Sequence, residues 1–363
     1  MNVRIISAIA VVTLLSGLSA VAIGEITEGA GPVTITDGTG RTFEYSEPTG
    51  RIITMGYAST LTVVMLGEID KIIAVDKYST YDYTKDERLK DLDVPELGFI
   101  YNASNNDYFM TTVVRWVEEE KMSLHDTIIL TAYSNAIVLR GLLEAVGFDH
   151  VLVYLSITAY DKIVEFVENM SIIVTGEVSN IVDDMKLVKE TIDKGLEGVT
   201  KKAKGLGVWY SASSGFSVGN TGSITVSLIE AAGGDNIAYI QSRGQTYGDK
   251  STIVQLVGDN PDVVIFLPHS YTRDHSVSDF RNEVLGSDNS IVILPMEMNW
   301  NNYDPDAAEG LWAFACALYP DLFEGPAPHA DDPSDSNLLL YTAAGAVAVI
   351  SVLALAYFVM RKP

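Results

Sequence analysis

The chain has 363 residues, 47% hydrophobic and 20% charged, which is long enough for two ordinary domains with buried cores and unlike a disordered polymer. Its 24 basic and 48 acidic residues give a formal charge of −24, which excludes nucleic-acid binding as the main function, because phosphate recognition needs clustered Lys and Arg. The single cysteine, Cys316, excludes a disulfide framework, a CxxC redox motif and a thiolate zinc cluster.

Residues 1–24 have the features of a secretory signal. Arg4 precedes an apolar stretch from Ile5 to Ile23, and Ala20-Val21-Ala22 offers a cleavage site with small residues. The alternative is an uncleaved membrane anchor, since the apolar stretch is long for a signal. Either interpretation predicts that the following segment is exported.

Residues 338–360 contain no charge and are long enough to cross a bilayer as a helix. Arg361 and Lys362 follow directly, and basic residues beside a span favour the cytoplasmic side. We therefore expect a C-terminal membrane anchor with the body outside the cell, the alternative being a buried core helix. The acidic, Pro-rich residues 324–337 are predicted to form an extended stalk.

The body alternates strand and helix patterns. A hairpin is expected over residues 34–45, and short β-branched runs at 52–55, 72–75, 127–130 and 151–154 are separated by helical patterns such as 137–147. Strands that alternate with helices predict a parallel sheet covered on both faces. This first lobe occupies residues 25–160.

A helical connection is predicted over residues 161–204. Apolar residues at Met185, Val188, Ile192, Leu196 and Val199 have helical spacing, so one long helix is expected from Ile181 to near Gly205. Strand patterns resume at 207–210, 263–267 and 291–294 and define a second lobe, 205–323. The predicted fold is α/β: two lobes joined by a single long helix.

Aromatic and polar residues gather where the predicted strands end. Ligands of open α/β sheets bind at the carboxyl ends of the strands, so we expect these side chains to line a cleft between the lobes. The alternative is that the aromatic rings only cap the wet edges of cores. The candidate ligand-binding residues are Tyr57, Tyr78, Tyr101, Tyr133, Trp209, Arg243, Tyr247, His269, Tyr271 and Trp300, with Arg243 suited to a carboxylate or phosphate.

Motifs for catalysis are not found. Residues 248–252 resemble a phosphate-binding loop, but Asp249 replaces the glycine before the lysine and would repel phosphate. His269, Asp274 and His275 could bind a metal, although solvated histidines explain them better. Nothing assembles a nucleophile, a base and an orienting group, so we predict a protein that is not an enzyme and holds no resident cofactor or metal.

The body resembles a known family over residues 33 to 323. The resemblance lies in Val33-Thr-Ile-Thr-Asp-Gly-Thr-Gly-Arg41 and in the segments 50–53, 66–75, 232–238, 260–265 and 311–323. These segments are similar to the solute-binding proteins of ABC importers, in the group that carries ferric siderophores, haem and cobalamin. The resemblance implies two α/β lobes joined by a long helix that permits little closure. It also implies an ABC permease with its ATPase as partners and a metal chelate as ligand.

The resemblance further implies docking on the permease through one glutamate on each lobe. The family has Pro-Asp where this chain has His125-Asp126, and counting back from that position gives Glu118, with Glu119 adjacent. The same count from Pro261 reaches Val254 and Gln255, which carry no charge.

Together these patterns predict an extracellular, membrane-anchored solute-binding protein that captures an iron chelate, haem or a corrinoid. A surface enzyme or a sensor ectodomain on the same scaffold is the alternative, because fold does not fix function. Glycosylation sequons occur at Asn102 and Asn169 and fit an exported body.

Overall fold

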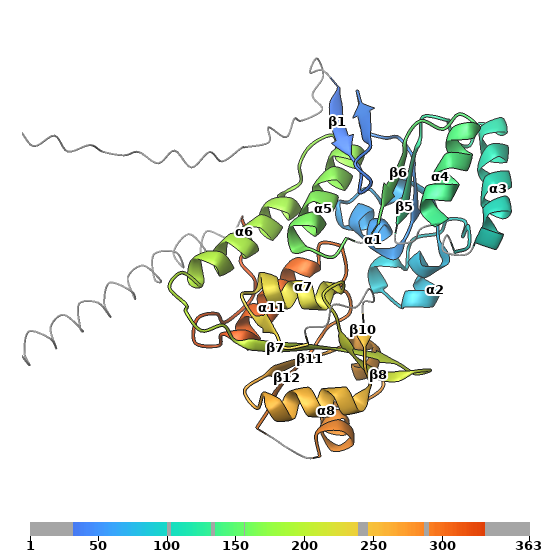
Figure 1. The fold of residues 1–363 in the computed structure, drawn as a ribbon. Helices are drawn as coiled ribbons and strands as arrows, with labels where there is room; N and C mark the ends of the chain where they lie inside the picture. The colour runs from blue at the N-terminus through green and yellow to red at the C-terminus, as the bar shows by residue number, and fades with distance from the viewer. Residues whose placement is uncertain are drawn as a thin grey trace, which may run out of the picture.

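A computed structural model describes residues 32–99, 103–131, 135–155, 157–238, 246–286 and 290–330. They form two lobes with helices running between them (Figure 1). The predicted signal, 1–24, and the predicted anchor, 338–360, lie outside the described residues. Within the described ranges, the helices are too short or too polar to cross a membrane.

The first lobe, here the N-lobe, is built on a parallel four-stranded sheet in the order β4-β3-β5-β6. The strands are β3 (Ile52–Met55), β4 (Ile72–Val75), β5 (Thr127–Thr131) and β6 (Val151–Tyr154). An antiparallel hairpin of β1 (Val33–Thr36) and β2 (Thr42–Tyr45) precedes them. The β-branched runs and the hairpin of the sequence are confirmed.

Helices cover both faces of this sheet, as its almost wholly buried strands require. Side chains of α3 (Asn106–Glu118) and α4 (Asn135–Ala145) pack on one face. Those of α1 (Tyr57–Met65) and α5 (Tyr160–Thr175) pack on the other. The short α2 (Tyr81–Thr84) lies between the 3-10 turns Lys77–Ser79 and Glu87–Leu89.

The second lobe, the C-lobe, has a mixed sheet in the order β10-β8-β7-β11-β12, with β9 paired to β7. β7, β11 and β12 are parallel, whereas β8 and β10 are antiparallel to their neighbours. The strands are β7 (Lys204–Ser211), β8 (Gly215–Gly219), β9 (Asp235–Asn236), β10 (Thr246–Tyr247), β11 (Val264–Leu267) and β12 (Val292–Pro295).

The two faces of the C-lobe sheet have different neighbours. α7 (Ile224–Ala231) and α11 (Ala307–Leu318) cover the face toward the N-lobe (Figure 1). α8 (Lys250–Asp259), α10 (Val277–Phe280) and the π-helical turn Arg281–Leu285 cover the opposite face, and α9 (His269–Thr272) follows β11. The capping box of Asp249 and Thr252 starts α8. The loop that resembles a phosphate site is thus a helix N-terminus whose backbone N–H groups already donate to the Asp249 carboxylate.

The connection consists of α5 and then α6 (Asn180–Gly195), separated by a turn at Gly176, which has a φ of 88°. The single helix expected to reach Gly205 is wrong in its extent, because α6 ends at Gly195. A Cβ on Gly195 would lie 2.5 Å from the Phe323 ring, and Gly198 has a φ of 87°, which a helix cannot include. Leu196 and Val199 therefore lie beyond the helix that their spacing predicted.

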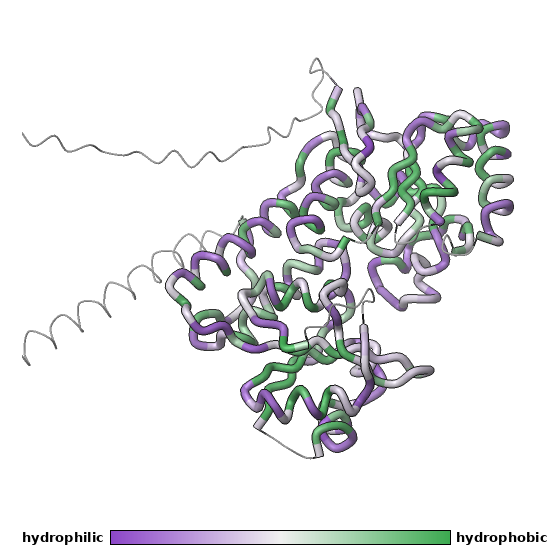
Figure 2. Tube along the Cα trace, viewed as in Figure 1, coloured by the Kyte–Doolittle hydropathy of each residue, from purple (hydrophilic) through white to green (hydrophobic). Residues whose placement is uncertain are grey.

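One apolar cluster joins the lobes. It runs from Ile52 and Val63 in the N-lobe through Phe166 and Val188 in the connecting helices to Phe314 in the C-lobe. Figure 2 shows hydrophobic segments concentrated in the two sheets and on the inner sides of the helices. Because the cluster is continuous, moving one lobe relative to the other would disturb close-packed side chains.

The sequon at Asn169 lies within α5. Its side-chain nitrogen donates to the Thr36 carbonyl at 3.1 Å, and the next two residues, Met170 and Ser171, are fully buried. Folding thus removes this asparagine from the exposed loop that glycosylation needs. Asn102 lies outside the described residues.

The first half of the predicted stalk is packed on the body rather than extended. Phe323 and Pro328 are buried, and the Trp312 indole N–H donates to the Gly325 carbonyl at 2.9 Å. Further along, the Ala330 backbone N–H donates to the Asp184 carboxylate of α6 at 2.6 Å. We call residues 324–330 the strap, because they run antiparallel to α6, from near Gly195 at its end to Asp184 near its start.

We predict that the strap contributes to folding stability and that the residues after it do not. A chain that ends at Ala330 should unfold at the same urea concentration as the complete exported protein. A chain that ends at Glu324 should be less stable by about 1–3 kcal/mol, because it loses the indole hydrogen bond and the burial of Pro328. Equal stability of the two truncated chains would show that the strap only rests on the surface.

Candidate functional site

The carboxyl end of β3 places Tyr57 at the junction of the lobes. Gly56, before it, has a φ of 152°, and a Cβ there would lie 1.7 Å from the Thr131 hydroxyl oxygen, so only glycine fits. The Tyr57 hydroxyl donates to the Asp86 carboxylate. Burial, followed by this hydrogen bond and the charge of Asp86, raises the pKa of Tyr57 well above its ordinary value. Tyr57 is therefore a neutral phenol whose hydroxyl proton is already donated to Asp86.

Arg88 bridges the two lobes at the same place. Its guanidinium donates to both oxygens of Asp306 in the C-lobe, at 2.9 and 2.8 Å, and to both oxygens of Asp86 in the N-lobe, at 3.0 and 2.8 Å. Asn299 adds donations to Asp86 at 3.4 Å and to Asp306 at 3.2 Å. We call Asp86, Arg88, Asn299 and Asp306 the inter-lobe brace. Sequence reasoning missed it, because its members come from two distant segments, with Arg88 and Asp306 218 residues apart, and belong to no motif.

The brace fixes the charge state of its members. Burial raises the pKa of Asp86, but hydrogen bonds from Arg88 and Tyr57 and the charge of Arg88 outweigh it, so the pKa lies below its usual range. Burial alone would lower the pKa of Arg88, yet its bonds to Asp306 and Asp86 raise it. Both groups stay ionised at neutral pH, and the guanidinium is occupied on two sides by carboxylates.

Asp304 lies beneath the brace and is fully buried. One of its oxygens accepts from the Asp306 backbone N–H at 3.0 Å, and the other has no hydrogen-bond partner in the part of the protein that is described. Burial, and then the charge of Asp306, raise the pKa of Asp304 well above its ordinary value. Protonation relieves the cost of a buried negative charge beside a second carboxylate.

Asp304 should make the protein less stable as the pH rises. Its folded-state pKa lies above the unfolded value of about 3.9, so unfolding releases a proton between these two values and stability falls by up to ~1.4 kcal/mol per pH unit. We expect Asp304→Asn to remove this slope, measured by urea unfolding from pH 4 upward. The exposed Asp321→Asn is the matched control and should leave the slope in place.

A group of aromatic side chains follows β4 and η2, the 3-10 turn Lys77–Ser79. The Tyr78 ring lies 4.8 Å from Tyr83 and 4.6 Å from Phe99, and Tyr83 is 53% exposed. We call these three rings the aromatic shelf. The Lys77 ammonium lies 5.7 Å from the centre of the Phe99 ring. Tyr78 was predicted from its place after a strand, whereas Tyr83, in the short helix α2, and Phe99 do not follow a predicted strand and were not.

The register of the C-lobe sheet separates the predicted aromatic residues. Trp209 alternates with Gly205 and Gly207, which face α7, and is therefore on the face toward the N-lobe, with 46% of its surface exposed. Tyr247 pairs with the buried Val218 and packs with the core of the opposite face. Trp209 is thus available to a ligand between the lobes, and Tyr247 is turned away from it.

The other predicted ligand residues have different surroundings. Tyr271 is 1% exposed and packs within the C-lobe core against Phe216, so its ring is not free to contact a ligand. Trp300 is half-buried against the apolar cluster, beside Gly310, and His269 is half-buried at the start of α9. Tyr101, Tyr133 and Arg243 lie outside the described residues.

His269, at the start of α9, and His275, beyond its end, do not gather with a third metal ligand among the described residues. Asp274 pairs with Arg273 at 3.0 Å, and the His275 ring stacks on Tyr271 at 4.6 Å. Among the described residues, no group of three His, Cys, Asp or Glu side chains converges as metal ligands would.

Glu118 and Glu119 lie at the edge of the N-lobe sheet opposite to Tyr57, because α3 ends there before β5 begins. Glu119 pairs with Lys121 at 2.7 Å and with Arg115 at 3.9 Å. Glu118 is exposed and forms no ion pair with the residues that the structure describes. Of these two glutamates, Glu118 is therefore the one available to a basic partner.

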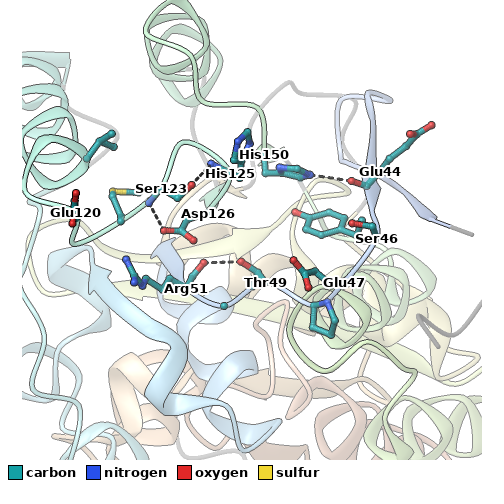
Figure 3. A pocket seen from close by; sticks show the side chains of 15 residues that line it. Glu44, Ser46, Glu47, Thr49, Arg51, Glu120, Ser123, His125, Asp126 and His150 are labelled. Atoms are coloured by element: carbon teal, nitrogen blue, oxygen red, sulfur yellow. Dashed lines mark hydrogen bonds between the residues drawn. The ribbon is translucent and has the colours of Figure 1, made fainter. Parts of the chain in front are cut away.

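A hollow of about 800 Å³ opens beside these glutamates (Figure 3). It is lined by acidic residues such as Glu47 and Asp126, by Arg51, and by two histidines. His125 and His150 both share hydrogen bonds with the Asp149 carboxylate, at 2.6 and 2.7 Å. These bonds fix the imidazoles to the rim of the hollow.

Comparison with known proteins supports the fold. No family model and no curated protein matches the sequence. Among solved structures, CeuE of Helicobacter pylori, in complex with nickel and histidine, is 16% identical over 80% of this chain and 89% of its own, with a TM-score of 0.58. The periplasmic heme-binding protein RhuT of Roseiflexus is 15% identical over 74% and 99%, with a TM-score of 0.54.

The periplasmic vitamin B12 binding protein BtuF of Vibrio cholerae is 17% identical over 75% of this chain and 98% of its own, with a TM-score of 0.54. The two-lobed fold of this chain is therefore that of periplasmic proteins that bind heme and vitamin B12, and of a protein from an ABC-type Fe3+-hydroxamate transport system. The fold that the sequence resemblance implied is confirmed. At these identities the likeness establishes the fold alone.

Proposed function

We propose that this protein is the extracellular solute-binding protein of an ABC importer, and that it captures an iron chelate, haem or a corrinoid and delivers it to a membrane permease. The observation that carries the proposal is that exposed aromatic rings occur on both lobes, in the aromatic shelf of the N-lobe and at Trp209 on the C-lobe face toward the N-lobe, while one continuous apolar core joins the lobes. The fold shared with haem, siderophore and B12 binding proteins supports it.

The chemistry of the junction favours binding of a preformed chelate. Tyr57 is a neutral phenol bonded to Asp86, so it offers a ring rather than an oxygen that could coordinate iron. The Arg88 guanidinium is occupied by two carboxylates. What remains is an aromatic surface, which suits the apolar face of a macrocycle or flat chelate. In this proposal the metal arrives within the cargo, and the protein needs no resident cofactor.

Replacement of Trp209 by Ala should weaken chelate binding by about 1–3 kcal/mol without loss of folding, because the indole is exposed before the ligand arrives. Fluorescence titration with hemin, cyanocobalamin and a ferric hydroxamate siderophore measures this. Trp209→Phe is the matched control and should retain most of the affinity. Binding of none of the three chelates to the unmodified protein would contradict the proposed function.

We also propose that the permease contacts Glu118. α3 is about 20 Å long by the usual rise per residue, so a permease that covers α3 reaches from the lobe junction to Glu118. Residues 338–360 would anchor the body to the membrane beside this partner.

Glu118→Gln should reduce uptake of the chelate while its affinity for the isolated protein stays unchanged, because an unpaired rim charge acts on the encounter with a partner. Glu119→Gln is the matched control and should have the smaller effect, since Glu119 is already paired with Lys121. A loss of chelate affinity in Glu118→Gln would place this glutamate in the binding site instead.

A further inference from the structure

Lys77 differs from its neighbouring lysines in having no acidic partner. Lys71 pairs with Glu68 at 3.0 Å, Lys85 with Asp82 at 3.5 Å and Lys90 with Glu87 at 4.0 Å. Within the described ranges, Lys77 forms no ion pair, although the chain carries a charge of −24. A solitary ammonium on such an acidic body is therefore open to an anion from outside the protein.

The ammonium of Lys77 is also held beside an apolar surface. It lies 5.7 Å from the centre of the Phe99 ring, within the range of a cation–π contact. Phe99 packs on Tyr78, which packs on Tyr83. A positive charge thus stands at the edge of the aromatic shelf, and the exposed Tyr83 ring extends the shelf away from it.

The backbone places this arrangement at the lobe junction. The Lys77 N–H donates to the Gly98 carbonyl at 3.3 Å, which ties the turn after β4 to the segment that carries Phe99. The same stretch of chain continues through α2 to Arg88, which binds Asp306 of the C-lobe. Figure 1 shows α2 on the side of the N-lobe that faces the C-lobe.

We propose that Lys77 selects the charge of the ligand: a flat chelate stacks on the aromatic shelf and places a carboxylate or phosphate substituent on the Lys77 ammonium. This inference rests on the proposed function and narrows it to chelates that carry an anionic group beside an apolar face. Such a contact is charge-assisted and forms at the edge of an apolar surface, where water screens it less than on an open surface.

The test compares hemin, which has two free carboxylates, with hemin dimethyl ester, which has none, and with cyanocobalamin, whose anionic group is a phosphodiester. Each is titrated into the full-length protein and into Lys77→Met. We expect the unmodified protein to bind hemin about tenfold more tightly than the ester, as one charged hydrogen bond would give, and Lys77→Met to lose this preference. If Lys77→Met instead lost affinity for cyanocobalamin but kept the preference for hemin, the contact would be assigned to phosphate.

Two further variants sharpen the result. Lys77→Arg should keep the preference, because it keeps the positive charge, and Lys90→Met should also keep it, because Lys90 is paired with Glu87. An unchanged preference for hemin over its ester in Lys77→Met, together with an unchanged affinity for cyanocobalamin, would overturn the inference and leave the proposed function in place. Failure of the unmodified protein to bind any chelate would overturn both.

Discussion

A single apolar cluster runs from the N-lobe sheet through α5 and α6 into α11, and the arrangement of the lobe junction depends on it. Phe166 and Val188 of the connecting helices are buried in a cluster that includes side chains of both lobes, so the lobes share one interior. In two-lobed proteins that close around a ligand, a few residues absorb the motion. Here the motion would have to break close packing over two helices, which favours a fixed separation of the lobes.

The inter-lobe brace adds direction to this apolar contact. Removing charges from water is costly, and a pair such as Arg88 and Asp306 recovers the cost only with good geometry and further hydrogen bonds. The brace has both: two bidentate contacts to Arg88 and an amide from Asn299. Hydrophobic packing tolerates small sliding movements, whereas bidentate contacts do not, so the brace fixes the angle at which the lobes meet.

Local patterns predicted the elements well and their partners poorly. The strands of the N-lobe were found because buried β-branched runs have few other structures available. α6 ends earlier than predicted because Gly195 lies against the Phe323 ring and Gly198 has a positive φ. The periodicity of apolar residues does not reveal either feature. Position after a strand predicted Trp209 and Tyr271 equally, yet the core contains Tyr271. Tyr271 lies in α9, which packs against β7, so its burial depends on contacts with distant residues such as Phe216 that the local pattern does not report.

The fixed lobe junction has a consequence for how long a ligand stays bound. A receptor that closes can trap its ligand, and the rate of opening then limits release. For the ligand binding that we propose, the brace and the shared core oppose such trapping, so the residence time would be set by the contacts between ligand and surface. The affinity and the lifetime of the proposed complex would then change together, and a ligand held tightly enough to be scavenged would leave slowly unless another protein competes for the same aromatic surface.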